Sequence, residues 1–387
     1  MIFPGLCDPE LPALERLDQA DLARITGAET ANLLRFRYQP GARAVLHVAL
    51  GDAAEASEGS IWFYAGRKTQ GLMQRLPVAR LDAVSGALFQ AFPHDHRMPH
   101  LATFVAGAAD FAPQLIGGKA AAPPDLMRYR PGLSATFRWT RTDGRVFYVK
   151  LTPDSDVSAQ AHAVAGLAAT TRDPSLSFAA VEGVMPDLGL IAYAAAEGQP
   201  LDRAIAGAGP DLAGRLMEQT VRALGRLWTL PAAPTRVLDR SAHLLRSEQA
   251  RKMIALMDPE AGKMAAALEA ELRAAHVPVR RQTIHADMKL DHAFLSGDCT
   301  TLIDIESLSL GDPDYDLAKL EARLHMAVLA RQITAAEAAA GVAALRPFVG
   351  PHYLWFLTCA RMQCAKFFAQ RFSAATFPLM RKVLAPC

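Results

Sequence analysis

Apolar residues follow two different spacings along the chain. In the first half they alternate with other residues over short stretches, at Ala44, Leu46 and Val48 and then at Ala135, Phe137 and Trp139. A period of two predicts β-strands with one buried face. From about residue 202 they recur every three or four positions, at Leu212, Leu216, Val221, Leu224 and Leu227. This spacing predicts amphipathic helices, so we expect a strand-rich first part and a mainly helical second part.

A short pattern occurs twice in the first half. Residues 37–41 read RYQPG and residues 128–132 read RYRPG, and each leads into one of the alternating stretches. The Pro-Gly pair predicts a tight turn, so each copy is typical of a strand-turn-strand hairpin. Five positions are few, and a chance match between two hairpins of one antiparallel sheet is the alternative to a true repeat.

Each copy is followed by an aromatic stretch, residues 61–64 in the first and residues 146–151 in the second. The second stretch ends on a lysine. When the Phe-Tyr pairs of the two stretches are set against each other, Lys150 of the second copy falls on Gly66 of the first. By this alignment the first copy lacks the lysine.

Composition excludes several classes of protein. Hydrophobic residues make up 51% of the chain, which suits a large packed core. Lysine and arginine total 41 against 39 acidic residues, so the net charge of +2 gives no strong attraction to nucleic acid or to anionic lipid. No stretch reaches the roughly 18 uninterrupted apolar residues of a membrane span, and the N-terminus lacks the apolar segment of a signal peptide.

The cysteines show neither the CxxC spacing of a zinc site nor a disulfide framework. They are Cys7, Cys299, Cys359, Cys364 and Cys387. This usage is typical of the reducing cytoplasm. We therefore expect a cytoplasmic globular protein without membrane or nucleic-acid partners, and its oligomeric state is left open.

One region places carboxylates at the ends of two short apolar strands. Residues 283–295 contain Asp287, residues 301–306 contain Asp304, and residues 296–298 predict the turn between the strands. Phosphoryl transfer from a nucleotide needs one carboxylate to accept the proton of the attacking hydroxyl and others to hold magnesium on the phosphates. This region is therefore the candidate for the chemistry.

The order of these residues resembles the aminoglycoside phosphotransferase and choline kinase families. Their pattern H-x-D-x-x-x-x-N, then I-D, then G-D-P-x-x-D-L-A, is matched by residues 285–292, 303–304 and 311–318. His292 stands at the Asn position, where some relatives of the maltokinase type carry Gln. The resemblance is good from about residue 125 to residue 330 and implies a protein-kinase-like fold.

The resemblance implies a role for each matched residue. Asp287 would be the catalytic base, and His285 would brace its loop. Asp304 would hold magnesium, with His292 beside it as a second metal ligand. Asp316 would start the following helix and hold the loop in place. As an alternative, Asp312 and Asp316 are plain turn and cap residues, since a carboxylate at a helix N-terminus binds orphan N–H groups.

The same resemblance assigns the nucleotide site. Lys150 would bind the α- and β-phosphates, although a lone lysine at the end of an apolar strand is by itself typical of a solvated strand end. Residues 188–201 resemble the hinge between the lobes, where the backbone near Tyr193, Ala194 and Ala196 would bind the adenine. ATP and Mg²⁺ are the implied cofactors, and GTP in place of ATP stays open.

Three positions depart from the family pattern. Magnesium prefers oxygen ligands to the imidazole of His292, so the neighbouring Asp291 as the ligand, or His292 acting through a water, are alternatives. A pKa near 6.5 would make this imidazole cationic between about pH 7 and pH 6. Residues 158–167 lack the glutamate that pairs with the strand lysine and offer Gln160 or His162 instead. The turn that would cover the phosphates has a single glycine, Gly132.

The sequence therefore predicts an α+β, bilobal protein-kinase-like fold in three parts. Residues 1–121 are an extra module with the first hairpin, residues 122–198 a small antiparallel-sheet lobe, and residues 199–387 a helical lobe with the catalytic and metal loops. The predicted function is ATP-dependent phosphotransfer to a hydroxyl of a small molecule such as a sugar, an aminoglycoside or choline. The alternative is a weakly active or inactive pseudokinase that binds nucleotide or ligand without phosphotransfer.

Overall fold

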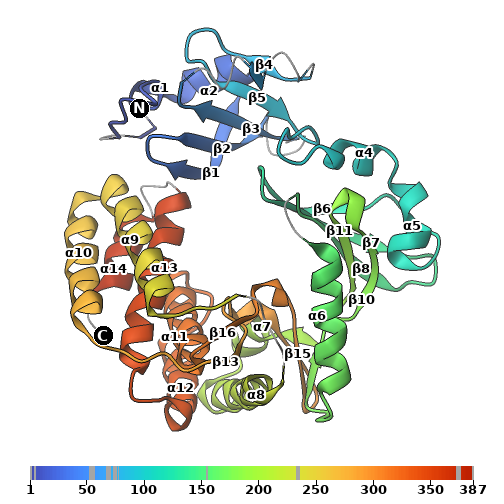
Figure 1. The fold of residues 1–387 in the computed structure, drawn as a ribbon, viewed down its shortest axis with the longest axis vertical. Coiled ribbons are helices and arrows are strands. Elements are labelled where there is room, and N and C mark those ends of the chain that lie inside the picture. The colour runs from blue at the N-terminus through green and yellow to red at the C-terminus, as the bar shows by residue number, and fades with distance from the viewer. Residues whose placement is uncertain are drawn as a thin grey trace. The chain divides into compact units, whose positions relative to one another are not determined.

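Two compact units make up the computed structural model (Figure 1). The first, called the sheet unit, holds Met1–Ser158, Glu182–Ala194 and Gln370–Ser373. The second, called the helical unit, holds Ala159–Val181, Ala195–Ala369 and Ala374–Cys387. The structure describes residues 2–3, 6–51, 57–66, 71–72, 76, 78–153, 156–231, 236–371 and 376–385. The three-part division predicted at residues 121 and 198 stays a prediction.

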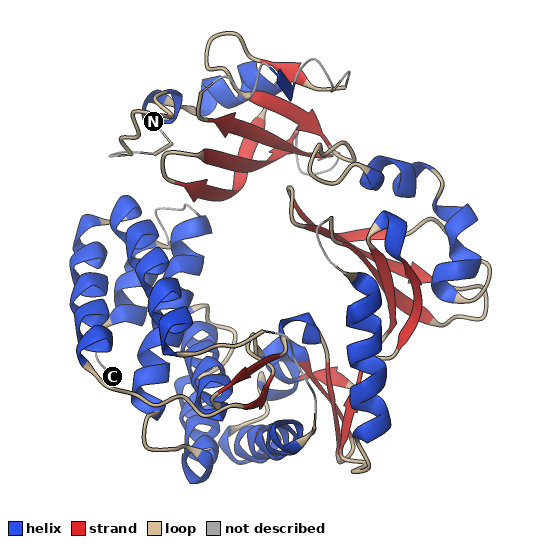
Figure 2. Ribbon diagram, viewed as in Figure 1, coloured by secondary structure: helices blue, strands red, loops and turns tan. Residues whose placement is uncertain are grey.

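The sheet unit contains two five-stranded sheets and short helices (Figure 2). Its first part holds α1 (Ala13–Arg16), α2 (Gln19–Thr26), β1 (Ala31–Gln39), β2 (Arg43–Leu50), β3 (Ser57–Tyr64), β4 (Arg80–Leu81) and β5 (Leu88–Ala91). Its second part holds α4 (His100–Ala106), α5 (Ala108–Ile116), β6 (Asp125–Arg130), β7 (Ser134–Thr140), β8 (Val146–Leu151), β10 (Val181–Met185) and β11 (Leu190–Ala194).

The helical unit confirms the change of spacing near residue 202. Its helices are α6 (Val157–Thr170), which starts in the sheet unit, α7 (Leu201–Ile205), α8 (Pro210–Thr229), α9 (Arg240–Met257), α10 (Pro259–Ala274), α11 (Pro313–Leu329), α12 (Ala335–Leu345), α13 (Tyr353–Arg371) and α14 (Phe377–Leu384). Short strands lie among them, namely β9 (Leu176–Phe178), β12 (Gln199–Pro200), β13 (Gln282–Ile284), β14 (Ala293–Ser296), β15 (Cys299–Leu302) and β16 (Ser309–Gly311).

The two sheets of the sheet unit have the same topology. Their strand orders are β1-β2-β3-β5-β4 and β6-β7-β8-β11-β10. The hairpins also share their register, because Tyr38 faces Ala44 in the first and Tyr129 faces Ala135 in the second. The recurring RYxPG pattern therefore marks a true repeat of a five-stranded sheet, and the interpretation as a chance match is wrong.

The Pro-Gly pairs form the turns that the sequence predicts. Gly41 and Gly132 have φ values of 66° and 64°, in the left-handed region that favours glycine. In each turn the residue after the glycine donates its backbone N–H to the carbonyl three residues earlier, over 3.1 Å in the first copy and 2.9 Å in the second. Proline followed by a glycine of positive φ is typical of a type II turn.

The strand registers correct one sequence-based alignment. Thr136 faces Lys150 on β8, and its counterpart Val45 faces Trp62 on β3. The counterpart of Lys150 in the first sheet is therefore Trp62, and the alignment with Gly66 was wrong. The alignment of the Phe-Tyr pairs failed because β2 and β3 are longer than β7 and β8. A comparison of residue types alone does not reveal this difference in strand length.

Helices α4 and α5 pack on the second sheet. The core joins Leu101 and Phe104 of α4 and Leu115 of α5 to Phe137 and Trp139 of β7. Phe104 meets Trp139 edge-on, with ring centroids 5.9 Å apart. Because these side chains are almost fully removed from solvent, α4, α5 and the second sheet form one packed body.

The predicted periodicity locates α8 but not the whole of its buried face. Val221, Leu224 and Leu227 are fully buried, whereas Leu212 near the start of the helix is 39% exposed. Met217, which the three-to-four spacing left out, is fully buried. The helix packs against α12, so tertiary contacts select which of its apolar residues are covered.

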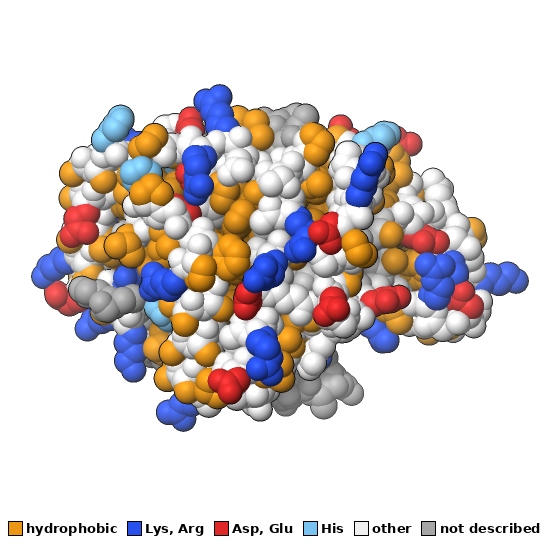
Figure 3. Space-filling model, turned by 90° about the horizontal axis from the view of Figure 1, so that it is seen from below, with side chains coloured by type: hydrophobic (Ala, Val, Ile, Leu, Met, Phe, Trp, Pro, Cys, Tyr) orange, Lys and Arg blue, Asp and Glu red, His pale blue; other side chains and the backbone are white. Residues whose placement is uncertain are grey.

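Charged side chains of both signs are interspersed with apolar ones on the face shown in Figure 3. This agrees with the balanced composition of 41 basic and 39 acidic residues. Within the described residues, no helix combines the length and the apolar character that crossing a bilayer requires.

Candidate functional site

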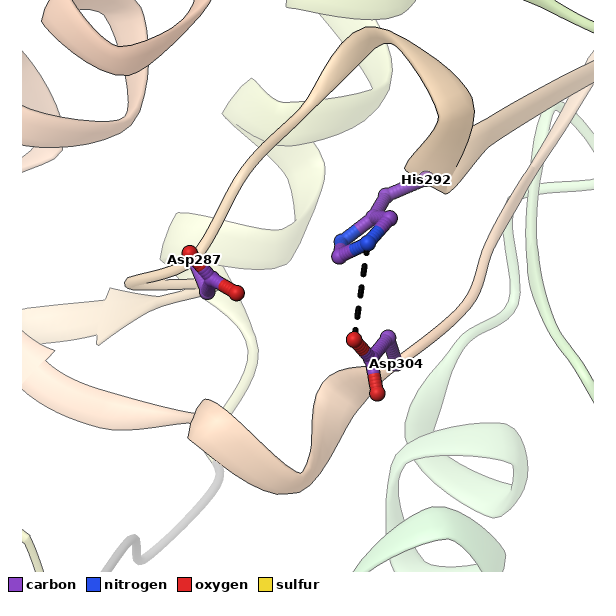
Figure 4. Close-up of side chains that lie close together, drawn as sticks. All are labelled: Asp287, His292 and Asp304. Carbon is purple, nitrogen blue, oxygen red and sulfur yellow. Dashed lines mark ion pairs between the residues drawn. The ribbon is translucent and has the colours of Figure 1, made fainter. Parts of the chain in front are cut away.

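Three side chains from two loops of the helical unit lie close together (Figure 4). Asp287 and His292 belong to the segment after β13, and Asp304 follows β15. One ligand atom of each lies within 4.8 Å of the ligand atoms of the other two. His292 Nε2 is 3.4 Å from Asp304 Oδ2. The fold thus brings together the predicted base and the two predicted metal ligands.

Strand pairing holds the two loops side by side. β14 pairs with β15 so that Ala293 faces Leu302. One residue beyond this pair, the backbone N–H of Ile303 donates to the carbonyl of His292 over 3.0 Å. The ladder therefore places His292 beside Asp304, although a turn separates them in the sequence.

Two residues of these loops have left-handed backbone. Ala286 has a φ of 65° and Asp304 a φ of 58°. A side chain in this region costs about 1–2 kcal/mol, so surrounding contacts have to hold it. At Ala286 the contact is the carboxylate of Asp316, which accepts from the backbone N–H of His285 and of Ala286, each over 2.9 Å.

Asp316 holds the loop from inside α11, where it is fully buried. The indole N–H of Trp228 also donates to its carboxylate, over 3.1 Å. The helix itself is capped by Asp312, whose side chain accepts from the backbone N–H of Asp314 over 3.1 Å. The alternative of a plain cap is therefore confirmed for Asp312 and wrong for Asp316, which lies in the first turn of α11 and holds the loop as the resemblance implies.

His285 links the two loops through its ring. Its Nε2 lies 2.9 Å from the carbonyl oxygen of Ile303, a contact in which Nε2–H donates. The side chain is fully buried, and Nδ1 has no hydrogen-bond partner among the described residues. This geometry suits a residue that braces the two loops.

Lys289 lies among the three converging side chains, and the sequence-based interpretation did not include it. Its Nζ is 3.0 Å from Asp287 Oδ2 and 3.9 Å from Asp304 Oδ2. The same Nζ is 3.0 Å from His292 Nε2. Its position in the same loop, two residues after Asp287, could have indicated that it lies near the carboxylate. An ammonium group therefore stands where the candidate ligands meet.

Lys319 of α11 contacts the other oxygen of Asp287. Its Nζ donates to Asp287 Oδ1 over 3.0 Å, and the residue is only 5% exposed. Sequence reasoning missed it as well. Residues three apart on a helix share one face, so the spacing between Asp316 and Lys319 was a signal that both face the loop.

Charge and burial set the protonation of Asp287 and Lys319. Burial raises the pKa of Asp287, but the ammonium groups of Lys319 and Lys289 outweigh it, and the net pKa lies well below its ordinary value. Burial lowers the pKa of Lys319, and the Asp287 carboxylate more than compensates, so that the net pKa is raised. The two groups form a firmly ionised pair.

The surroundings of His292 favour its neutral imidazole. Burial lowers its pKa well below 6.5, and the Lys289 ammonium lowers it further. The expectation that His292 becomes cationic between about pH 7 and pH 6 was wrong, because it used the pKa of a solvated imidazole. Its Nε2 accepts from Lys289, and its Nδ1 is buried without a partner among the described residues.

The converging side chains fit a divalent cation in charge and donor type. Asp287 and Asp304 offer carboxylate oxygens, which Mg²⁺ prefers, and His292 offers a neutral nitrogen. Because the Lys289 ammonium lies among them, a metal ion has to displace it to reach all three. Lys289 would thus compete with a metal ion bound there.

The predicted nucleotide residues lie on two neighbouring strands of the second sheet and just beyond them. Lys150 is on β8 and faces Ile191 of β11. Tyr193 and Ala194 end β11, and Ala196 follows two residues after the strand. The sheet therefore groups Lys150, Tyr193 and Ala194, separately from the group around Asp287.

The sequence profile of the phosphotransferase enzyme family (APH) matches residues 125–352, more than half of the chain. The chain belongs to this family. The match begins at the first residue of β6 and ends just before α13, so it includes both loops around Asp287 but not the first sheet. It confirms the predicted family and the prediction that the protein is a phosphotransferase. No curated protein sequence matches the chain.

Solved structures share the fold at low sequence identity. One is a protein from Ralstonia eutropha that is described as an aminoglycoside phosphotransferase. It is 15% identical with a TM-score of 0.50, and the match covers 71% of this chain and 93% of the Ralstonia chain. A thermostable mutant of APH(4)-Ia, solved with AMP-PNP and hygromycin B, is 11% identical with a TM-score of 0.50, covering 72% and 97%. Choline kinase LicA from Streptococcus pneumoniae is 13% identical with a TM-score of 0.49, covering 74% and 99%. The predicted α+β kinase-like fold class is confirmed.

Proposed function

We propose that this phosphotransferase transfers the γ-phosphoryl group of ATP to a hydroxyl of a small molecule. The observation that carries the proposal is the convergence of Asp287, His292 and Asp304 within the region that matches the family. The structural neighbour solved with AMP-PNP and hygromycin B supports a nucleotide and a small polar acceptor as the two substrates.

Asp287 orients the acceptor hydroxyl and takes its proton. Lys319 and Lys289 bind its two oxygens and keep it ionised. A carboxylate of low pKa is a weak base, so the proton moves to it as the new bond to phosphorus forms and not beforehand. This suits phosphoryl transfer, which relies on positioning more than on strong bases.

The reaction moves one phosphoryl group and one proton. The acceptor oxygen bonds to the γ-phosphorus, the bond from that phosphorus to the bridging oxygen breaks, and ADP leaves. Asp304 and His292 would hold Mg²⁺, which when bound neutralises charge on the phosphates. Lys319, whose ammonium is buried, keeps the Asp287 carboxylate in one orientation throughout.

The second sheet would bind the nucleotide. Lys150 supplies a cation for the α- and β-phosphates, and the backbone near Tyr193, Ala194 and Ala196 supplies hydrogen bonds for the adenine. The arrangement of Lys150 and β11 on neighbouring strands supports this assignment, since it puts a cation and the end of the hinge strand on one sheet.

The test is acceptor-dependent formation of ADP. Purified protein is mixed with ATP, Mg²⁺ and a panel of sugars, aminoglycosides and choline. We expect ADP to form with at least one acceptor, and Asp287→Asn to lower kcat by about 10²- to 10⁴-fold with little change in ATP affinity. Asp291→Asn, an exposed carboxylate four residues on, is the matched control and should keep its activity. Full activity of Asp287→Asn would exclude the proposed base.

One observation favours a second function, nucleotide binding without phosphotransfer. Lys289 already supplies a cation at the position where a metal would sit, and His292 replaces an oxygen ligand. Thermal shift with ATP separates the two functions. Stabilisation that needs Mg²⁺ supports the phosphotransferase, whereas equal stabilisation with and without Mg²⁺ and no ADP with any acceptor supports the second function.

A further inference from the structure

The repeat in the sheet unit is longer than its hairpins. Residues 8–14 read DPELPAL and residues 95–101 read DHRMPHL, so both have the pattern D-x-x-[LM]-P-x-L. In each, the proline is the N-cap of a helix, α1 in one and α4 in the other. Each pattern is followed by two short helices and then by the same five-stranded sheet. We call residues 8–91 the first copy and residues 95–194 the second copy.

The aspartate of each pattern binds the turn of its own hairpin. In the first copy, Asp8 Oδ2 accepts from the Tyr38 hydroxyl over 2.6 Å and from the Gly41 N–H over 2.9 Å. In the second copy, Asp95 Oδ2 accepts from the Tyr129 hydroxyl over 2.9 Å and from the backbone N–H of the turn glycine over 2.6 Å. The two carboxylates thus make the same pair of contacts, on the tyrosine and the glycine of RYxPG.

The other carboxylate oxygen of each aspartate also accepts a hydrogen bond, and it does so in the same way in both copies. Asp8 Oδ1 accepts from the Glu10 N–H over 3.0 Å, and Asp95 Oδ1 accepts from the Arg97 N–H over 2.9 Å. The two residues are 5% and 4% exposed. A buried carboxylate with every oxygen bonded to a fixed donor is a rigid anchor, so both turns are tied to the segment that precedes the helices.

The two copies differ in what lies at the lysine position. The second copy has Lys150 there, and the first has Trp62. Trp62 is fully buried, and an added Cβ on Gly132 would come within 2.4 Å of its ring. The tryptophan of the first copy therefore lies directly against the turn of the second copy, and only glycine fits between them.

Further residues of the first copy contact the same turn and the residue next to its anchor. Arg37 Nη2 donates to the carbonyl of Pro131 over 2.9 Å. The imidazole of His96, next to Asp95, makes two hydrogen bonds to the first copy. Its Nε2 lies 2.8 Å from the Tyr64 hydroxyl, and its Nδ1 lies 2.7 Å from Gln90 Oε1. The first copy thus touches both the Gly132 turn, residues 130–133, and His96, the residue next to its anchor.

We propose that the first copy is a positioning module for the Gly132 turn, with Trp62 and Arg37 as its positioning residues and Asp95 as the anchor that they support. The inference rests on the proposed function, in which the second copy binds the nucleotide, and takes the turn to cover the phosphates as the family resemblance implies. The first copy has Trp62 at the position of Lys150, and this tryptophan lies against the turn of the copy that carries the lysine.

The physical benefit is preorganisation. A flexible glycine-rich turn has to be ordered when the nucleotide binds, and that ordering opposes binding. The Gly132 turn has one glycine and is fixed by hydrogen bonds from Asp95 and Arg37 and by the ring of Trp62. Nucleotide affinity therefore depends on residues that precede the family-matched region, which begins at residue 125.

The internal repeat supplies a matched control for the test. Asp95→Asn and Asp8→Asn weaken the same contacts in the two copies, but only Asp95 anchors the turn of the copy that carries Lys150. Steady-state kinetics of the full chain with ATP and the best acceptor give KM and kcat. We expect Asp95→Asn and Arg37→Gln to raise the KM for ATP by about fivefold or more with a smaller change in kcat, and Asp8→Asn to leave this KM within about twofold. Arg37→Lys, which keeps a donor, should recover most of the loss.

Hydrogen exchange of the Gly132 amide is the second measurement, and it needs no nucleotide. We expect this amide to exchange about tenfold faster in Asp95→Asn than in the wild type or in Asp8→Asn. An unchanged KM for ATP in Asp95→Asn, or an equal rise in Asp95→Asn and Asp8→Asn, would overturn the positioning role. A wild-type chain that forms no ADP would instead overturn the proposed function, and it is detected before any variant is compared.

Discussion

Lys289 and Asp287 stand two residues apart in the sequence and form an ion pair of 3.0 Å at the centre of the candidate metal site. The ammonium is also 3.9 Å from Asp304 Oδ2, so it lies near both carboxylates and offsets part of their negative charge. The Lys289 ammonium can therefore hold the two loops together when no metal is bound. It also makes metal binding an exchange of one cation for another.

Replacing Lys289 by Met should strengthen binding of Mg²⁺ in the absence of nucleotide. The metal would no longer compete with an ammonium group, and at the effective dielectric of a half-buried site we expect about a five- to tenfold lower dissociation constant. Titration calorimetry measures it. Lys263→Met, an exposed lysine of α10, is the control and should bind as the wild type does. Equal affinity in Lys289→Met and wild type would contradict the exchange.

Asp304→Ala should remove the dependence of ATP binding on Mg²⁺. Asp304 is half-exposed in a left-handed turn that aims its carboxylate at His292, and no change of the fold is expected from its loss. ATP affinity is measured by calorimetry with Mg²⁺ and with EDTA. Glu306→Ala, on the same loop, serves as the control. If Asp304→Ala keeps the magnesium-coupled affinity of the wild type, another residue is the ligand.

His292→Asn should preserve or raise ATP turnover. The amide oxygen is a harder ligand for Mg²⁺ than the neutral imidazole nitrogen, and Asn is small enough for the buried position. Steady-state kinetics with varied Mg²⁺ give the turnover and the metal concentration for half-maximal rate, which should fall. A folded but inactive variant would give His292 a role of its own, such as a contact with the acceptor.

Asp316→Asn should destabilise the loop and lower activity together. The amide keeps one acceptor oxygen, so one of the three N–H donors from His285, Ala286 and Trp228 loses its partner in a fully buried place. An unsatisfied buried donor costs about 1–3 kcal/mol. Urea denaturation measures the free energy of unfolding. If Asp316→Asn has the stability and the turnover of the wild type, the carboxylate does not hold the loop.

Stability should fall in mild acid because of His243. Burial among Tyr315, Trp355 and Phe356 lowers its pKa to about 3, while the unfolded chain has an ordinary imidazole. Below about pH 6.5 the unfolded state therefore binds a proton that the folded state does not, so the free energy of unfolding falls as the pH falls toward 3.

His243→Phe should remove this part of the pH dependence. At pH 5 the difference amounts to about 2 kcal/mol of stability relative to pH 7. Urea denaturation at the two pH values measures it, with His276→Phe, an exposed histidine, as the control. The same loss of stability from pH 7 to pH 5 in His243→Phe and wild type would show that another group titrates.

Much of the candidate site was readable in the sequence because its residues follow one another in a fixed local order. His285, Asp287 and His292 lie in one loop, and Asp304 follows after a single hairpin. A short hairpin brings its two ends together whatever the rest of the chain does, so this spacing predicted the convergence. The repeat of RYxPG was readable for the same reason, since a Pro-Gly turn specifies its own conformation.

The cations at the site and the full extent of the repeat needed the tertiary structure. Lys319 reaches Asp287 only because α11 packs under the loop, and Trp62 corresponds to Lys150 only through strand registers that hairpins of unequal length conceal. Asp95 contacts Gly132 across two helices and a strand. Local order along the chain determines turns, caps and motifs, whereas packing between distant segments decides which charges meet, and this packing depends on many weak contacts that no single stretch of sequence contains.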